Sequence, residues 1–285
     1  MECVPNFSEG RDSGKIEAIA GAIRGAGVAL IGYEADPDHN RSVVTFAGPP
    51  EAVAQAALAG VARAVELIDI RRHDGVHPRI GAADVLPFVP LSGVTLEDCA
   101  LLAHRVGEEI WRRLRVPVFF YEAAALSPER RRLENIRRNG AAGMAPDIGG
   151  PFHPTAGAVA VGARKFLIAL NVNLDSTDLE AARAIARAVR ESSGGLPCVK
   201  AMGVRLASRN QVQVSMNLTD FERTPVEEAF EAVRQEAARH AIAVAEMELI
   251  GFIPRKAFDA AVAAGLNCAN FAGRVLESRL NRLID

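Results

Sequence analysis

The sequence predicts an α+β fold in two halves, each with the element order β-α-β-β-α-β. Three observations support this prediction. Short runs rich in β-branched residues alternate with longer amphipathic or alanine-rich runs. The same order of runs occurs twice, on either side of a glycine- and proline-rich stretch at residues 144–162. Hydrophobic residues make up 49% of the chain and charged residues 24%, which is ordinary for a globular protein with a full core.

The first half begins with a complete set of these elements. They are a strand near 2–7, a helix near 12–26, strands near 28–34 and 42–48, a helix near 50–67 and a strand at 84–89. Residues 42–46 read Ser-Val-Val-Thr-Phe, a composition typical of strands. Pro49 and Pro50 open the second helix, where proline is tolerated in the first turn. A helix at 95–114, a strand at 117–121 and a solvated, arginine-rich helix at 129–138 are predicted to follow.

The second half repeats the order. We predict a strand at 165–173, a helix at 177–191, strands at 199–207 and 211–218, a helix at 225–240 and a strand at 243–250. The two middle strands form a hairpin around residues 208–210, and Thr224 is the candidate cap of the helix that follows it. A last helix begins at Pro254.

Both halves therefore show the ferredoxin-like order of strands and helices. We predict two ferredoxin-like (βαββαβ) subdomains forming α/β sandwiches, at residues 1–164 and 165–285. No residue-level repeat accompanies the repeated pattern.

Composition excludes several classes of function. The net charge of −2 and the aromatic content of 5% argue against a nucleic-acid partner. The four cysteines are widely scattered, so neither a disulfide framework nor a zinc site is indicated. No apolar stretch approaches the ~20 residues that span a bilayer, and the amino terminus lacks the features of a signal peptide. We therefore expect a cytoplasmic protein with no membrane and no metal.

Residues 72–84, Arg-His-Asp-Gly-Val-His-Pro-Arg-Ile-Gly-Ala-Ala-Asp, are the strongest candidate for a site. A histidine can accept and return a proton within one turnover near neutral pH. His77 is favoured over His73 as a catalytic residue because Pro78 and Arg79 flank it. A metal site built from the two histidines is disfavoured, since Gly75 and Pro78 interrupt the helix it requires. An exposed polar loop is the other alternative.

Residues 144–162 are either a domain linker or a ligand-binding loop. Four glycines and three prolines in this stretch, with Gly143 directly before it, prevent a regular element, and glycine lets the backbone approach a flat heterocycle. The spacing of the glycines matches neither a dinucleotide fingerprint nor a phosphate-binding Walker loop. His153 in this stretch is a candidate ligand contact.

The segment 36–41, Asp-Pro-Asp-His-Asn-Arg, joins two predicted strands and has the composition of a turn. Arg41 nevertheless offers a rigid fork for a carboxylate, so Asn40 and Arg41 are candidates for substrate binding. His104 lies inside a predicted helix and is interpreted as structural.

Several motifs together resemble those of the glutamate formimidoyltransferase (formiminotransferase) family. Residues 2–10, Glu-Cys-Val-Pro-Asn-Phe-Ser-Glu-Gly, and His-Pro-Arg at 77–79 are the most specific. Asn40-Arg41, the segment 46–50, the segment 162–169 and the segment 213–221 continue the match in order. The resemblance extends over nearly the whole chain.

The resemblance implies transfer of the formimino group from N-formimino-L-glutamate to N5 of the co-substrate tetrahydrofolate. It implies that His77 is catalytic and that the folate-binding stretch runs from Gly149 to Gly157, where Ala156 replaces a tryptophan. The implied folate contacts are Gly149, Gly150, Pro151, Phe152, His153, Pro154, Thr155 and Gly157. The candidate substrate-binding residues are Asn40, Arg41, Arg79 and Arg164. Asp74 or Asp84 is expected to orient His77.

The resemblance also implies a homodimer with folate in a groove between the subdomains. Animal members carry a fused cyclodeaminase domain, so we expect a separate cyclodeaminase to release ammonia from this protein's product. Two other functions stay open at this point. One is formyl exchange between 5-formyltetrahydrofolate and glutamate, and the other is folate binding without catalysis. A purely structural module would leave the polar loops unexplained.

Overall fold

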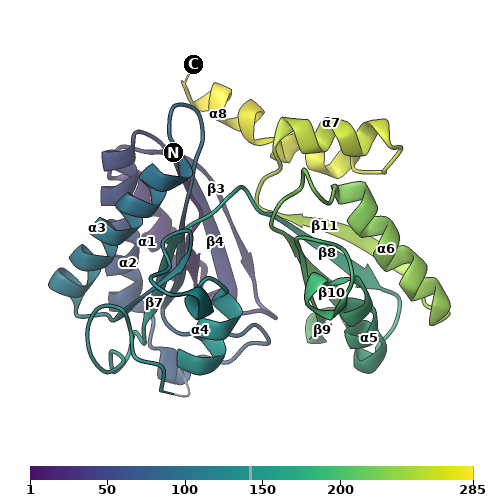
Figure 1. Cartoon of the computed structure of the whole chain (residues 1–285), viewed down its shortest axis with the longest axis horizontal. Coiled ribbons are helices and arrows are strands. Elements are labelled where there is room, and N and C mark those ends of the chain that lie inside the picture. Colours follow the sequence, from purple (N-terminus) through teal and green to yellow (C-terminus); the bar gives the residue numbers. More distant parts are fainter. Residues whose placement is uncertain (141–142, 285) are drawn as a thin grey trace. The chain divides into compact units, whose positions relative to one another are not determined.

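The computed structural model describes residues 1–140 and 143–284 and has mixed α+β secondary structure (Figure 1). The chain divides into two compact units, Met1–Lys165 and a second one that begins at Phe166. Each unit is built around one β-sheet, and helices pack against each sheet. The predicted α+β class is therefore confirmed.

The first unit contains one sheet of seven strands. The strands are β1 (Glu2–Cys3), β2 (Asn6–Phe7), β3 (Ala29–Asp36), β4 (Arg41–Ala47), β5 (Ala83–Val89), β6 (Val118–Glu122) and β7 (Val159–Ala163). Across the sheet, β3 pairs with β4, β1 and β2 lie between β4 and β5, and β7 separates β5 from β6. Pairing is antiparallel except at β7, which runs parallel to both of its neighbours.

Four helices accompany this sheet. They are α1 (Ser13–Arg24), α2 (Pro50–Leu67), α3 (Leu96–Leu114) and α4 (Leu133–Gly140), with 3₁₀ turns η1 (Ile70–Arg72) and η2 (Pro128–Arg130). α2 has the predicted bounds. α3 begins at a capping box, in which Thr95 accepts a hydrogen bond from Asp98 N while the Asp98 carboxylate accepts one from Thr95 N.

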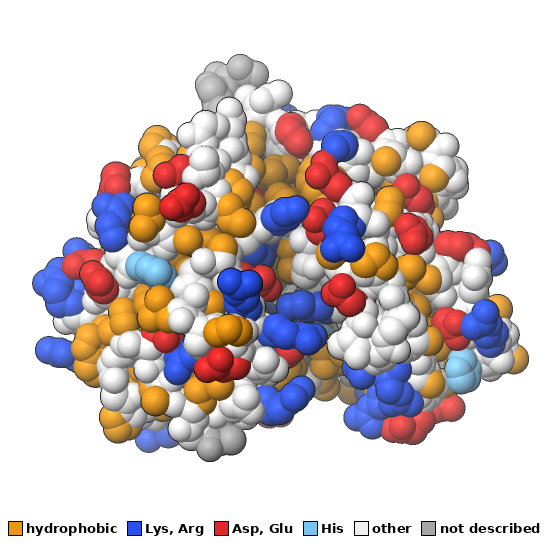
Figure 2. Space-filling view, in the orientation of Figure 1, with side chains coloured by type: hydrophobic (Ala, Val, Ile, Leu, Met, Phe, Trp, Pro, Cys, Tyr) orange, Lys and Arg blue, Asp and Glu red, His pale blue; other side chains and the backbone are white. Residues whose placement is uncertain are grey.

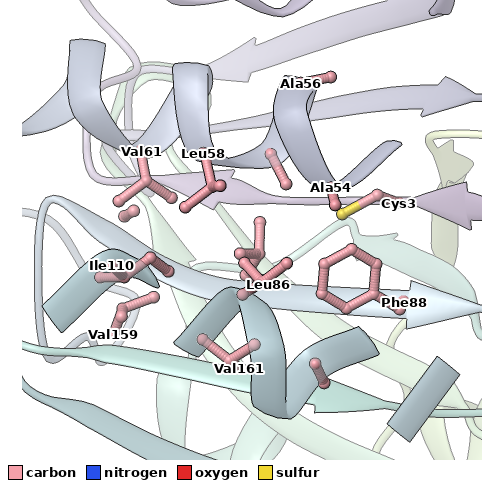
Figure 3. Packing of buried hydrophobic residues seen from close by; sticks show 14 of the residues in the cluster. Cys3, Ala54, Ala56, Leu58, Val61, Leu86, Phe88, Ile110, Val159 and Val161 are labelled. Atoms are coloured by element: carbon pink, nitrogen blue, oxygen red, sulfur yellow. The ribbon is translucent and has the colours of Figure 1, made fainter. Parts of the chain in front are cut away.

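β5 lies in the core of the first unit, between the strands that pair with it. All seven residues of β5 are buried, and Leu86 and Phe88 are fully buried. Figure 3 shows their side chains close to those of α2, α3 and β7. Because protein interiors are close-packed, β5 is a rigid base for the polar residue Asp84 near its start.

The second unit contains a four-stranded antiparallel sheet. Its elements are β8 (Ile168–Leu174), α5 (Leu179–Val189), η3 (Glu191–Ser193), β9 (Val199–Leu206), η4 (Ala207–Arg209), β10 (Gln211–Leu218), α6 (Val226–Arg239), β11 (Val244–Ile250), α7 (Arg255–Ala263), η5 (Ala269–Arg274) and α8 (Leu276–Ile284). The strand order is β11-β8-β10-β9. Every second residue of β8 and β10 points into the apolar core, which α5, α6 and α7 complete. The hairpin predicted between β9 and β10 is confirmed.

One part of the glycine-rich stretch was predicted wrongly. We expected no regular element in residues 144–162, but β7 begins at Val159, and all its residues are buried. β7 is short and apolar, and parallel pairing on both sides lets it tolerate Gly162. At Gly162 a Cβ atom would lie 2.5 Å from the ring of Tyr121, so the glycine permits close packing.

Two helix starts also differ from the prediction. α5 begins at Leu179, two residues later than predicted, because the Asp178 side chain caps it by accepting hydrogen bonds from two backbone N–H groups. Thr224 does not cap α6, so that prediction was wrong. Pro225 occupies the cap position, and Thr224 Oγ1 donates instead to Pro197 O at 2.5 Å.

Charged side chains of both signs are scattered over the face drawn in Figure 2. Within residues 1–140 and 143–284, no helix combines the length and the apolar character that a membrane span requires.

Gly203→Ala tests the close packing of α5 on β9. A Cβ atom at Gly203 would lie 2.5 Å from Arg183 N and 2.6 Å from Ala182 C, both backbone atoms of α5. We expect the substitution to lower the free energy of unfolding by about 1–3 kcal/mol in urea denaturation. The control Gly21→Ala lies in α1 with no atom within 4 Å of its Cβ position, and should raise stability by up to ~1 kcal/mol. Equal effects of the two would contradict the packing argument.

Candidate active site

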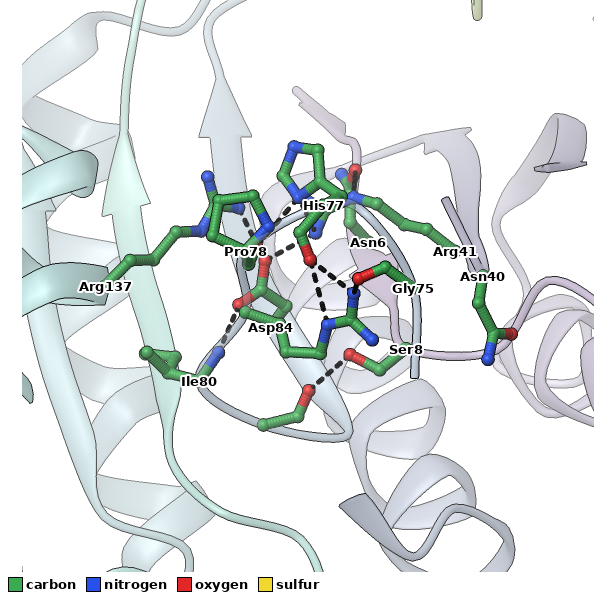
Figure 4. A network of polar contacts seen from close by, with 12 residues as sticks. Asn6, Ser8, Asn40, Arg41, Gly75, His77, Pro78, Ile80, Asp84 and Arg137 are labelled. Atoms are coloured by element: carbon green, nitrogen blue, oxygen red, sulfur yellow. Dashed lines mark hydrogen bonds and ion pairs between the residues drawn. The ribbon is translucent and has the colours of Figure 1, made fainter. Parts of the chain in front are cut away.

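Asp84 is the centre of a buried polar network in the first unit (Figure 4). Its side chain is 0% exposed. Arg41 Nη1, from the start of β4, donates to Asp84 Oδ2 at 2.6 Å. Arg137 Nη2, from α4, donates to the same oxygen at 2.5 Å. Ile80 N donates to Oδ1 at 2.8 Å, so both carboxylate oxygens have partners within the protein.

The two guanidiniums determine the charge of this network. Burial alone would raise the pKa of Asp84, because it disfavours the charged form. Arg137 and Arg41 outweigh burial and hold the pKa of Asp84 well below its ordinary value. Burial lowers the pKa of Arg41 to about 10, which still leaves it protonated at neutral pH. Two positive charges and one negative charge give the group a net charge of +1.

Arg41 also connects this group to the first strands of the unit. Its Nε donates to Asn6 Oδ1 at 2.9 Å, and Asn6 Nδ2 donates to Val4 O at 3.0 Å. The Arg41 side chain is only 12% exposed. Its guanidinium is thus held on two sides and can adopt little other geometry.

His77 lies beside Arg41. Its ring faces the polar network around Asp84, and its backbone carbonyl helps to hold the loop at residues 72–84 in place. The ring Nδ1 is 2.7 Å from Pro78 O and 3.3 Å from Arg41 Nη1. A carbonyl oxygen can only accept, so the shorter contact assigns the proton to Nδ1. The lone pair is then on Nε2, to which no group hydrogen-bonds in the part of the chain that the structure describes. Nε2 is therefore free to act as a base.

The surroundings keep His77 neutral. Burial lowers its pKa, and the positive charges of Arg41 and Arg137 lower it further. Asp84 and the Pro78 carbonyl act in the opposite direction but do not compensate. The pKa of His77 therefore lies well below its usual value of ~6.5, and the imidazole is unprotonated at neutral pH.

The loop that carries His77 is joined closely to the turn before β4. Asn40 has a φ of 46°, a left-handed conformation that asparagine tolerates better than most residues. Its Oδ1 accepts from Gly10 N at 2.9 Å, and its Nδ2 donates to Asp74 O at 2.8 Å. At Gly75 a Cβ atom would lie 2.5 Å from His39 O, so only glycine permits this approach.

Arg79 closes the same loop from inside. Its Nε donates to His77 O at 3.1 Å, and its Nη2 donates to His77 O and, at 2.9 Å, to Gly75 O. Its Nη1 lies 2.8 Å from His73 Nε2. These bonds use the guanidinium to shape the backbone on both sides of His77.

Two other candidates lie apart from the network. The Asp74 side chain is 84% exposed and pairs with Arg11 at 2.7 Å, and among the residues that the structure describes it makes no hydrogen bond to His77. Asp84, the other candidate for orienting His77, contacts Arg41 Nη1, which in turn lies 3.3 Å from His77 Nδ1. Arg164 follows β7, where its backbone N donates to Phe88 O at 3.1 Å and its Nη1 donates to Lys165 O at 3.0 Å.

The stretch from Gly149 to Gly157 packs against the end of the His77 loop. Gly157 has a φ of 69°, and a Cβ atom there would lie 2.2 Å from Ile80 O. Gly149 has a φ of 97° and lies against the Trp111 ring. Ala156 is 2% exposed. The packing of the protein itself therefore requires both of these glycines, whether or not a ligand approaches them.

His153 has a defined tautomer in this stretch. Its Nδ1 accepts from Ala156 N at 3.1 Å and from Thr155 N at 3.3 Å, which leaves the proton on Nε2. Phe152 meets Phe119 edge to face, with ring centroids 6.0 Å apart. The other predicted members are accessible: Pro151 and Pro154 are exposed, and Gly150 is partly exposed.

Sequence reasoning missed Arg137. We expected residues 129–138 to form a solvated helix, which was wrong for two of its arginines. The Arg137 side chain is 13% exposed because it pairs with Asp84. The Arg130 side chain is 15% exposed and pairs with Asp147 at 2.7 Å. Nothing in that arginine-rich run distinguishes these two from their exposed neighbours. Asn6 was also not named as a site residue, because its contact with Arg41 joins segments 35 residues apart.

A second polar cluster lies in the second unit, within the predicted family motif at 213–221. Gln213 Nε2 donates to Asn173 Oδ1 at 2.8 Å, and both side chains are completely buried. Glu248 Oε2 lies 3.3 Å from the same nitrogen. The cluster occupies the face of the sheet opposite the apolar core, because Val212 and Val214 face that core.

In residues 1–140 and 143–284, no group of three or more His, Cys, Asp or Glu side chains is placed to hold a metal ion. His73 Nε2 faces the cationic Arg79, which disfavours a cation at that atom.

Comparison with known families gives matches along most of the chain. The model described as "Formiminotransferase domain, N-terminal subdomain" matches residues 1–164. The model described as "Formiminotransferase domain" matches residues 169–269.

Individual relatives agree with these matches. The "Glutamate formimidoyltransferase" of Thermoplasma acidophilum is 41% identical over 99% of this chain and 97% of its own length. That of Streptococcus pyogenes is 42% identical over 90% of each chain. The "Formimidoyltransferase-cyclodeaminase" of Rattus norvegicus is 43% identical over 90% of this chain but only 50% of its own length.

Asp84→Asn tests the importance of the buried carboxylate. The substitution leaves two guanidiniums that are only 12% and 13% exposed without their counter-ion. We expect it to lower the free energy of unfolding by about 3–5 kcal/mol in urea denaturation. The control Asp74→Asn breaks an exposed pair and should cost no more than ~1 kcal/mol. Similar losses for both would contradict a special role for Asp84.

The acid dependence of stability gives a second test of Asp84. Its folded-state pKa is depressed, so its contribution is fully present above the unfolded-state value of ~3.9 and is lost as pH falls below it. We would measure the free energy of unfolding between pH 2 and pH 5, a range that brackets that value. In the wild type it should decrease as the pH is lowered. The fall should be shallower in Asp84→Asn, and an unchanged slope would argue that other carboxylates cause the acid sensitivity.

Proposed function

The chain belongs to the formiminotransferase family, and we propose that it transfers the formimino group of N-formimino-L-glutamate to N5 of tetrahydrofolate. The products are 5-formiminotetrahydrofolate and glutamate. The observation in the structure that supports this proposal best is a neutral imidazole, His77, with its proton on Nδ1 and the lone pair of Nε2 available. The reaction requires such a base.

We assign the catalytic proton transfers to His77. N5 of tetrahydrofolate attacks the carbon of the protonated formimino group and forms a new N–C bond, while the π electrons of the C=N bond move to the terminal nitrogen. The carbon is then bonded to three nitrogens. His77 Nε2 takes the proton that N5 must lose and becomes an imidazolium. It then donates that proton to the glutamate nitrogen as the bond from this nitrogen to carbon breaks and the lone pair of the terminal nitrogen re-forms the C=N bond. The imidazole ends the cycle neutral, and such proton transfer contributes ~10²–10⁴-fold to the rate.

The charges around His77 suit this cycle. Arg41 and Arg137 destabilise the imidazolium, so the proton passes readily to the leaving nitrogen. The net charge of +1 on the group formed with Asp84 favours anionic substrates. N-formimino-L-glutamate carries two carboxylates, and the folate tail carries more.

The roles of the other candidates follow from their contacts. We propose that Arg41 and Arg164 bind substrate carboxylates, because each guanidinium has five N–H donors, more than its hydrogen bonds within the protein described above use. Arg79 and Asn40 contribute by holding the loop, since their polar atoms are already bonded to protein. For the folate we retain the stretch from Gly149 to Gly157, in which Nε2–H of His153 is an available donor.

Several broader features belong to the same proposal. We infer that the subdomains, residues 1–164 and 165–285, are ferredoxin-like, which the strand order β11-β8-β10-β9 supports for the second. If β1 and β2 are counted as the one strand predicted near residues 2–7, the first has two strands beyond that pattern, β6 and β7. We further propose a cytoplasmic homodimer that acts in histidine degradation and one-carbon metabolism.

A direct assay tests the function. Purified protein is mixed with tetrahydrofolate and N-formimino-L-glutamate, the mixture is acidified, and the methenyltetrahydrofolate chromophore is measured. We expect product with the wild type and a kcat lower by about 10²–10⁴-fold in His77→Ala. The control His240→Ala changes an exposed histidine at the end of α6 and should leave kcat unchanged. No product with the wild type, but product from 5-formyltetrahydrofolate and glutamate, would favour formyl exchange instead.

The pH dependence of kcat/KM tests the electrostatics of His77. The pKa of His77 is lowered, and the residue is deprotonated at any pH above that pKa. The acidic limb of the kcat/KM profile should therefore lie below pH 6.5, the reference pKa of a free histidine. Arg137→Gln removes one of the charges that lower the pKa, so the limb should move to higher pH. Arg138→Gln makes the same change at the exposed neighbouring position, and its limb should not move. A limb that stays in place in Arg137→Gln would show that this charge does not control the base.

A further inference from the structure

A second histidine, His39, lies beside His77 and takes no part in the proton transfers proposed above. Its ring centroid is 5.9 Å from that of His77, and the two rings are tilted by 36°. It lies in the turn before β4, directly before Asn40 and Arg41. His39 is only 8% exposed.

The backbone of His39 is fixed, but its ring nitrogen Nε2 lacks a partner. Its backbone N donates to Asp36 Oδ1 at 2.8 Å, and its carbonyl lies against Gly75. Nε2 is buried and makes no hydrogen bond to any residue that the structure describes. A buried polar atom without a partner destabilises the folded state, so most such atoms in proteins are paired. This unpaired nitrogen belongs to a ring beside the proposed catalytic base.

Two neighbouring residues show the same pattern. His73 Nδ1 and Arg137 Nε are also buried and have no hydrogen-bond partner among the described residues. Both residues contact the network around His77 and Asp84 through their other nitrogens. Unpaired polar atoms at a site are satisfied by water or by a ligand. Because their residues lie next to the network around His77 and Asp84, a polar ligand at the proposed site is favoured.

The chemistry of the proposed reaction identifies the group that fits. The formimino group has a terminal N–H as well as the glutamate nitrogen, and both nitrogens are bonded to the carbon that N5 attacks. His77 must reach the nitrogens that exchange a proton, which leaves the terminal N–H for a second acceptor. An imidazole nitrogen next to His77 can accept that hydrogen bond.

We propose that His39 Nε2 accepts a hydrogen bond from the terminal N–H of the formimino group, and so positions the carbon for attack by N5 beside His77. This inference rests on the proposed function. His39 keeps an unpaired nitrogen in the resting protein, and the donor supplies its partner. The unpaired nitrogen of His39 thus lowers the stability of the resting protein but allows the substrate to be recognised, which is common at functional sites.

Three variants test the proposal by thermal unfolding and by kcat/KM for N-formimino-L-glutamate. His39→Leu removes the unpaired nitrogen and should raise Tm by about 2 °C while it lowers kcat/KM by about 10- to 100-fold. His39→Gln keeps an acceptor at a similar reach and should retain most of kcat/KM. His104→Leu is the matched control, because His104 Nε2 lies 2.8 Å from Ala124 O. It should lower Tm and leave kcat/KM unchanged.

The outcomes separate this inference from the proposed function. If the wild type transfers the formimino group and His39→Leu does so equally well, the role of His39 is overturned while the function stands. A fall in Tm in His39→Leu would likewise contradict it, because a structural histidine behaves in that way. If the wild type shows no transfer, the rise in Tm that N-formimino-L-glutamate causes is compared in the wild type and His39→Leu. Its loss in the variant supports the contact, and its persistence overturns it.

Discussion

A fully buried carboxylate between two guanidiniums is the constraint on which the rest of the site depends. Asp84 lies near the start of β5, a strand whose residues are all buried, and draws together Arg41 from β4 and Arg137 from α4. Neither arginine would remain buried without it, because an uncompensated charge is costly in the protein interior. The same two arginines adjust the pKa of His77, so one arrangement serves both the fold and the proposed chemistry.

The loop around His77 shows how much local sequence can predict. The mixture of histidine, arginine, glycine and proline at residues 72–84 indicates a site because few core segments require it. Asn40 and Arg41 can also be identified as candidates from the sequence, although their contacts with the loop around His77 cannot. The strands and helices follow from apolar periodicity, and the positions of β4 and α2 are predicted closely because their β-branched and proline signals are local.

The remaining parts of the site depend on contacts between distant segments. Arg137 is 53 residues from Asp84 along the chain, and nothing in its own neighbourhood sets it apart from the arginines beside it. The tautomer of His77 depends on one carbonyl contact, and the unpaired nitrogen of His39 is evident only once burial is known. β7 was missed because the glycines and prolines before it dominate the local composition, whereas its stability comes from pairing on both sides.

The central claim is that His77 is a neutral base with its proton on Nδ1. Nitrogen-15 NMR of the histidine side chains tests it most directly, because the shifts of the two ring nitrogens report both the tautomer and the titration. With His77→Gln used to assign the signal, we predict the Nδ1–H tautomer in the resting protein and no protonation at pH 6.5, the reference pKa of histidine. An Nε2–H tautomer, or an imidazolium at that pH, would contradict the account.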